Sequence, residues 1–212
     1  MTDPRVVTLT PAAVSATGYA TGVTGAAFVL TATSSGDGVA RQVSIFNTTA
    51  NTHVGQTLTL VGTDADGAAQ TEVITGPAGN ATVISTKFYL TLTSVTPSAT
   101  IGVDTFNIGW NGLWSTRTYP LNWHSPSACV VNVGLTGTCT YTVQQCFINT
   151  LTPTADPAQL AGWTNITGLA SQTASVNGAA TIGATGIRLT TASYTTGAVL
   201  VLTTNQPWAA RT

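Results

Sequence analysis

The sequence predicts an all-β protein made of two antiparallel β-sandwich or barrel-like domains. Threonine alternates with apolar residues, as in Thr57-Leu58-Thr59-Leu60 and Leu90-Thr91-Leu92-Thr93. Such a two-residue period is typical of half-buried antiparallel strands. Turn-forming residues, among them 21 Gly and nine Pro, separate these runs, and no long stretch has the 3.6-residue period of a helix.

In the first half, apolar or alternating runs predict strands at residues 5–10, 27–33, 41–47, 56–61, 69–75, 81–85, 87–95 and 104–108. Turn residues lie between them at 34–38, 64–67 and 76–80. The pair Asp66-Gly67 is a strong hairpin signal, because both residues tolerate positive φ.

The second half starts the strand pattern again, at residues 129–135, 137–147, 170–175, 186–191 and 197–203. In the second of these strands, Cys139, Tyr141 and Val143 share one face. The longest irregular stretch is 149–166. A short helix is expected at 156–162, where Asp156 can cap and Pro157 can occupy the first helical position.

The texture of the sequence changes between residues 109 and 126, where three of the five Trp lie without alternation. We place the domain boundary there, with domains at 1–110 and 125–212 and an aromatic linker at 111–124. Aromatic side chains with a polar end are favoured at protein interfaces. The residues expected to contact another domain or subunit are Trp110, Trp114, Tyr119, Trp123 and, near the C-terminus, Trp208.

Charged residues make up only 6% of the chain, and the net charge is −1. The six Lys and Arg are scattered, which argues against nucleic acid or an anionic membrane as a partner. No apolar run reaches the ~20 residues of a spanning helix. No signal peptide is recognisable, so we expect synthesis in a host cytoplasm. The solvent face should be uncharged and rich in hydroxyl groups, which suits contact with neighbouring subunits.

Few residues are candidates for chemistry. Asp64, Asp66 and Glu72 could hold a hard cation, although a hairpin turn at Asp66-Gly67, with Glu72 exposed on the return strand, explains them as well. His53 and His124 lack a recognisable nucleophile motif. We therefore expect no cofactor, no metal and no enzymatic activity; a hydrolase is a distant third alternative.

The three cysteines are Cys129, Cys139 and Cys146, all in the second half. Their number is odd and no metal-binding spacing accompanies them. Cytoplasmic synthesis favours free thiols, while a disulfide from Cys139 to Cys146 or to Cys129 stays open.

Several stretches carry a resemblance to known proteins. Residues 55–67, 71–77, 83–89, 101–103 and 108–109 resemble a domain common in structural proteins of tailed bacteriophages. Residues 138–144, Trp163, 186–189 and 197–200 are similar to phage virion domains. The resemblance implies a virion structural protein and no catalytic residues.

The function we expect is therefore a capsid decoration or minor capsid protein. Its partners would be the major capsid protein or other virion proteins, and further copies of itself in a symmetric assembly, with many weak contacts adding up by avidity. Trp208 would serve as an anchor. The alternatives are a carbohydrate-binding or adhesion module, which would use the same aromatic residues, and a neck or tail component.

Overall fold

The structure is a computed structural model that describes residues 5–122, 127–147 and 162–206. Strands are the only regular elements in these ranges, which confirms the all-β fold. No helix long and apolar enough to cross a membrane occurs in the described ranges. The short helix expected at 156–162 lies outside the described residues except for Gly162.

The chain divides into two compact units, and the division differs from the expected one. Residues 14–114 form what we call the continuous unit, whereas residues 1–13 and 115–212 together form the discontinuous unit. The first strand belongs to the discontinuous unit because it pairs with the last strand of the described chain. The expected linker at 111–124 is also wrong in part, since a single strand runs through residues 106–115.

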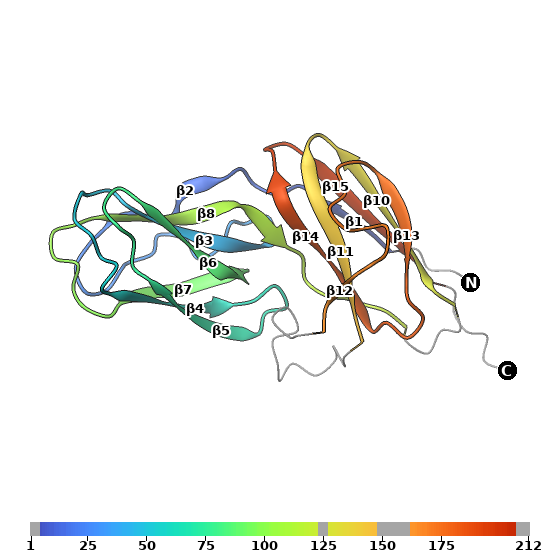
Figure 1. Cartoon of the computed structure of the whole chain (residues 1–212), viewed down its shortest axis with the longest axis horizontal. Coiled ribbons are helices and arrows are strands. Elements are labelled where there is room, and N and C mark those ends of the chain that lie inside the picture. The colour runs from blue at the N-terminus through green and yellow to red at the C-terminus, as the bar shows by residue number, and fades with distance from the viewer. Residues whose placement is uncertain (1–4, 123–126, 148–161, 207–212) are drawn as a thin grey trace. The chain divides into compact units, whose positions relative to one another are not determined.

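The continuous unit contains two antiparallel sheets (Figure 1). In one sheet, β8 pairs with β2 on one side and with β3 on the other, and β3 pairs with β6. The other sheet has the order β5-β4-β7. The strands are β2 (Ser15–Val23), β3 (Ala40–Asn47), β4 (Thr57–Thr63), β5 (Ala69–Thr75), β6 (Thr82–Tyr89), β7 (Thr91–Pro97) and β8 (Phe106–Ser115).

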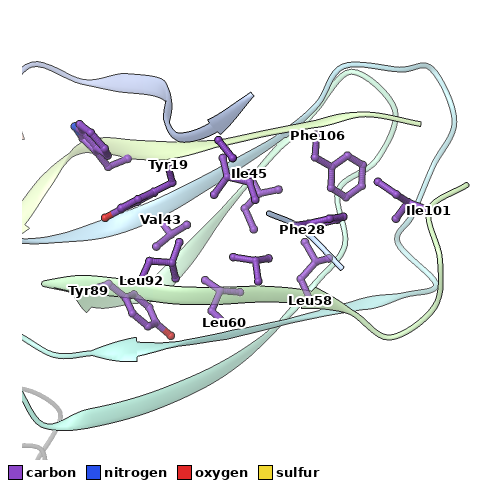
Figure 2. Close-up of a cluster of buried hydrophobic side chains, with 14 residues drawn as sticks. Tyr19, Phe28, Val43, Ile45, Leu58, Leu60, Tyr89, Leu92, Ile101 and Phe106 are labelled. Atoms are coloured by element: carbon purple, nitrogen blue, oxygen red, sulfur yellow. The ribbon is translucent and has the colours of Figure 1, made fainter. Parts of the chain in front are cut away.

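Apolar side chains from both sheets of the continuous unit meet in one core (Figure 2). Val43 and Ile45 of β3 pack with Leu58 and Leu60 of β4, and all four are buried. Aromatic rings close the core, including an edge-to-face pair of Phe28 and Phe106 with centroids 5.6 Å apart. The alternation that predicted β4 is thereby confirmed, because its leucines face inward.

The hairpin predicted at Asp66-Gly67 joins β4 to β5, with Thr63 paired to Ala69. Asp64 Oδ1 accepts the backbone N–H groups of Asp66 and Ala68 at 2.9 and 2.8 Å. Gly67 has φ of +85°, a region in which a side chain is strained.

We expect Gly67→Ala to lower the free energy of unfolding by about 1 kcal/mol, the cost of a left-handed backbone for a residue with a Cβ. Urea unfolding measures this change. Gly55→Ala is the matched control, because Gly55 is not in the positive-φ region and nothing lies within 4 Å of an added Cβ. Equal effects of the two substitutions would contradict the assignment of the turn.

The discontinuous unit also has two antiparallel sheets (Figure 1). One has the order β1-β15-β10-β13; in the other, β12 pairs with β11, β11 with β14, and β14 with β9. The strands are β1 (Arg5–Leu9), β9 (Tyr119–Pro120), β10 (Cys129–Thr136), β11 (Cys139–Cys146), β12 (Thr164–Asn165), β13 (Val176–Ala180), β14 (Gly186–Tyr194) and β15 (Val199–Asn205).

Side chains that alternate along the strands of the discontinuous unit point into its interior. Cys139, Tyr141 and Val143 are buried on one face of β11, and Leu200 and Leu202 are buried on β15. The three cysteines are buried and form no disulfide. Burial raises the pKa of the Cys139 thiol to about 11, so it stays protonated near neutral pH.

Two predicted strands are wrong. At 27–33 the backbone folds around β2 instead of forming a ladder, because Thr31 and Ala32 both donate to the Tyr19 carbonyl at 2.8 and 3.2 Å. At 170–175 the positive φ of Ser171 interrupts the extended chain, and Gln172 forms only an isolated bridge with Tyr141. The structure has β2 and β13 instead.

Candidate functional site

The outer side of the β5-β4-β7 sheet is a surface of uncharged side chains. We call it the uncharged face. Its outward side chains are Thr57, Thr59 and Val61 of β4, Thr71, Val73 and Thr75 of β5, and Ser94 and Thr96 of β7. None of them is charged, and each is exposed or half-buried. Hydroxyl groups and methyl groups therefore make up this surface.

The strand register brings these side chains into rows. Thr59 lies opposite Val73 on one side and Thr96 on the other, and Val61 lies opposite Thr71 and Ser94. Most are β-branched, so they have few rotamers to lose when another surface covers them. Covering the face would also desolvate no charge, which is the costly part of burying polar surface.

The aromatic residues expected at an interface are mostly buried. Trp110 is 8% exposed and stacks edge-to-face on Tyr19 with centroids 5.0 Å apart. Trp114 is fully buried, and Tyr119 is 4% exposed beneath the guanidinium groups of Arg5 and Arg117. All three rings are therefore largely covered within the chain itself.

The remaining aromatic candidates give less information. Trp123, Trp208 and His124 lie outside the described residues. Trp163 is half-buried, and Arg188 lies over its ring at 4.3 Å while donating to Gln144 Oε1 at 2.8 Å. One ring face of Trp163 is therefore occupied within the chain.

The acidic cluster does not form a cation site. Asp64 is fully buried and caps its own hairpin, whereas Glu72 points to the neighbouring strand β6. Among the described residues, no group of three His, Cys, Asp or Glu side chains is placed to hold a metal ion. The hairpin interpretation holds for Asp64, but the expectation that Glu72 is exposed is wrong.

Glu72 and Gln70 instead join the two sheets of the continuous unit. The Glu72 carboxylate accepts the backbone N–H of Thr86 at 2.7 Å and that of Lys87 at 3.1 Å, together with the Thr86 hydroxyl at 2.7 Å. Gln70 Nε2 donates to the Phe88 carbonyl at 2.6 Å. Side chains of β5 therefore satisfy the backbone of β6, where a sheet edge would otherwise be open. Burial and the nearby Glu72 raise the pKa of Tyr89.

His53 and Asp104 form a buried pair between two loops at one end of the continuous unit. His53 Nε2 lies 2.9 Å from Asp104 Oδ2, and the Asn51 amide donates to both oxygens of the same carboxylate at 2.9 and 3.2 Å. The His53 ring also stacks edge-to-face on Phe106. These contacts hold the two loops together at this end of the unit.

This arrangement predicts a dependence of stability on pH. The hydrogen bonds from Asn51, and to a smaller degree those from His53 and Thr49, hold the pKa of Asp104 below its ordinary value although burial opposes them. A carboxyl whose pKa is lowered by folding stabilises the protein above its unfolded pKa of about 4, and that contribution is lost as the pH falls through the folded pKa.

We therefore expect Asp104→Asn to be less stable than the wild type at about pH 7 and to lose less stability on acidification to about pH 3. Urea unfolding at both pH values measures this difference. Asp66→Asn removes an exposed carboxyl from the same unit and should keep the acid dependence of the wild type. Parallel pH profiles for the wild type and Asp104→Asn would contradict the role of this carboxylate.

A second buried ion pair lies near the other end of β3. Arg41 is fully buried; its Nε and Nη2 donate to Asp37 Oδ2 at 3.1 and 2.5 Å, and its Nη1 donates to the Asn111 carbonyl at 3.2 Å. Burial raises the pKa of the adjacent Tyr19 to about 12, although Arg41 opposes this. A pocket of about 220 Å³ lies nearby, and no charged side chain lines it; the lining residues are Ser34, Ser35, Gly36, Gly38, Val39, Leu90 and Thr91.

Comparison with known proteins adds no relative. No family model matches the chain, and no curated protein and no solved structure matches it either. Statements about function therefore rest on the residues of this chain.

Proposed function

We propose that the protein is a structural component of a tailed-bacteriophage particle, most simply a capsid decoration or minor capsid protein. Its partner would be the major capsid protein, and the contact would be made by the uncharged face of the β5-β4-β7 sheet. The observation that carries this proposal is the absence of charge from eight outward positions on three adjacent strands.

Such a face suits repeated contact with a lattice. Val73 is 60% exposed and lies on the sheet edge strand β5, and Val61 at the centre is 37% exposed. A neighbouring subunit that covers these methyl groups gains hydrophobic burial, while the threonine hydroxyls supply hydrogen bonds at its rim. Individually weak contacts of this kind hold firmly when a symmetric shell repeats them.

The aromatic residues give less support to the carbohydrate-binding alternative. Sugar rings stack on exposed aromatic faces, but Trp110, Trp114 and Tyr119 are buried. The uncharged face carries no aromatic side chain. The uncharged face supports a location in the neck or tail equally well. The number of copies per particle distinguishes that location from the shell.

A lysine on the uncharged face tests the proposed contact. We expect Val73→Lys to reduce the number of copies in purified particles tenfold or more, because an unpaired charge would be buried at the contact. Val130→Lys is the matched control, since Val130 is 52% exposed on β10 of the other unit, and it should incorporate normally.

Mass spectrometry of particles that carry each variant gives the copy number. Normal incorporation of Val73→Lys would show that this face is not the contact. Thermal unfolding of both isolated variants separates loss of binding from loss of folding, because exposed substitutions change stability by only about 0.5 kcal/mol.

A further inference from the structure

Strand β1 lies at the edge of the sheet with the order β1-β15-β10-β13. The other three strands of this sheet come later in the sequence, after the whole continuous unit. Strand β1 pairs antiparallel with β15 over five positions, from Arg5 opposite Thr204 to Leu9 opposite Leu200. In the sequence, residues 14–114, which form the continuous unit, separate β1 from the rest of the discontinuous unit. No hairpin therefore links β1 to β15, and β1 is connected to its sheet by backbone pairing and side-chain packing alone.

The β15 edge presents a site that fits this strand. Leu200 and Leu202 are buried on β15, and they lie opposite Leu9 and Val7. On the other side, β15 pairs with β10 along its length. Without β1, the row of backbone groups on β15 would be a template for any strand of matching pattern.

Few contacts hold β1 in place. Of its five side chains only Leu9 is buried, and Val6 is 60% exposed. The anchors outside the ladder include the Tyr194 hydroxyl, which donates to the Pro11 carbonyl at 2.5 Å, and the stacking of Arg5 on Tyr119 at 5.1 Å. Elements with so little buried surface open at a lower free energy than the whole fold.

We propose that β1 exchanges between copies of this chain, so that β1 of one copy pairs with β15 of a second copy. The exchanged strand makes the same backbone and side-chain contacts as in the single chain, so protein concentration decides between the two arrangements. The connection to the continuous unit is short, residues 10–13, and contains Pro11; short hinges favour exchange. Reciprocal exchange gives a closed dimer, and one-way exchange gives a ring or filament.

This inference goes beyond the proposed function and does not depend on it. It identifies the chemical class of one partner as a second copy of this chain, and it names the surface as the outer edge of β15. A protein that binds a lattice would gain an additional link between neighbours, but the exchange can be measured in solution without any particle.

Two full-length chains, each with one introduced cysteine, test the exchange directly. Thr8 lies opposite Val201 in the register, and both side chains point away from the core. Facing positions on paired strands have Cα atoms close enough for a disulfide. One chain carries Thr8→Cys and the other Val201→Cys, so the two introduced thiols face each other across the ladder when β1 of one copy pairs with β15 of the other.

The two full-length chains are mixed at several concentrations, incubated and oxidised, and the crosslinked positions are identified by mass spectrometry. The native thiols are buried, so they give little background. A third chain, Val73→Cys, replaces Thr8→Cys as the control for random collision, since Val73 is exposed in the other unit. A chain with both substitutions, oxidised when dilute, verifies the register.

We expect a heterodimer linked between positions 8 and 201 whose yield rises with concentration and exceeds that of the Val73→Cys control. Tyr194→Phe should accelerate its formation, because it removes the hydrogen bond to Pro11. A double-substituted chain that closes only on itself, together with a heterodimer yield no greater than the control at every concentration, would overturn the proposal.

Discussion

Glu72→Ala is expected to lower the free energy of unfolding by about 3 to 4 kcal/mol. The substitution removes the acceptor of two backbone N–H groups, those of Thr86 and Lys87, and of the Thr86 hydroxyl. Hydrogen bonds to a charged group contribute about 1.5–3 kcal/mol each when they are well formed, and less where the donor is partly exposed. Because these groups connect β5 to β6, the loss also opens the boundary between the two sheets of the continuous unit. Urea unfolding measures the change.

Two further variants separate this role from a general effect of mutation in β5. Glu72→Gln keeps one carbonyl acceptor and should lose less stability than Glu72→Ala. Thr71→Ala changes the outward side of the same strand and should stay within about 0.5 kcal/mol of the wild type. If Glu72→Ala were no more destabilising than Thr71→Ala, the side-chain connection between the sheets would be refuted.

Arg41→Met is expected to destabilise the protein by about 3–5 kcal/mol, the range found when one member of a buried ion pair is removed. Asp37 would keep its charge next to an apolar side chain, and the Asn111 carbonyl would lose its donor. Methionine matches the length of the arginine side chain, so the effect reports on charge more than on packing. Chemical unfolding gives the free energy.

A double-mutant cycle identifies the partner. Asp37→Asn removes the charge but keeps an oxygen that can accept from the Ser35 hydroxyl and the Val39 N–H. Combined with Arg41→Met it should recover part of the lost stability, because no unpaired buried charge remains. Additive losses in the double variant would show that Arg41 and Asp37 do not act as a pair.

The fold class and many of the strands could be predicted from the sequence because threonine alternates regularly with leucine and valine. Residues 57–63 illustrate this, since Leu58 and Leu60 are buried while Thr57 and Thr59 face outward. The same reasoning predicts the strand at 69–75 correctly but not its orientation, because Val73 faces outward and Glu72 faces inward. The Glu72 carboxylate faces inward because backbone N–H groups of β6 donate to it. The periodic pattern along β5 contains no information about these donors on another strand.

The unit boundary could not be predicted for a similar reason. Residues 5–10 were expected as a strand, and the strand is present, but its partner is almost two hundred residues away at Val199–Asn205. Local sequence signals specify that a segment is extended and do not specify which edge it completes. The buried ion pair of Arg41 and Asp37 was missed because Asp37 belongs to a turn whose fold brings it back over β3.

The aromatic cluster at 109–126 contains buried residues as well as residues outside the described ranges. Its tryptophans were interpreted as contact residues because they lie outside the alternating pattern. In the structure β8 covers residues 106–115, and Trp110, which lies on it, belongs to the core of the continuous unit. The composition predicts a solvent face that is uncharged and rich in hydroxyl groups. The uncharged face of the β5-β4-β7 sheet fits this description and is the surface that we propose for the contact.

The central claim, that this chain is a virion structural protein, is tested most directly by quantitative mass spectrometry of purified particles from the source of the sequence. The measurement gives the copies of this chain relative to the major capsid protein. We expect on the order of hundreds of copies, as for a subunit repeated over a symmetric shell. About a dozen copies would instead indicate the neck, the tail or a vertex. Absence of the chain from the particles would contradict the account.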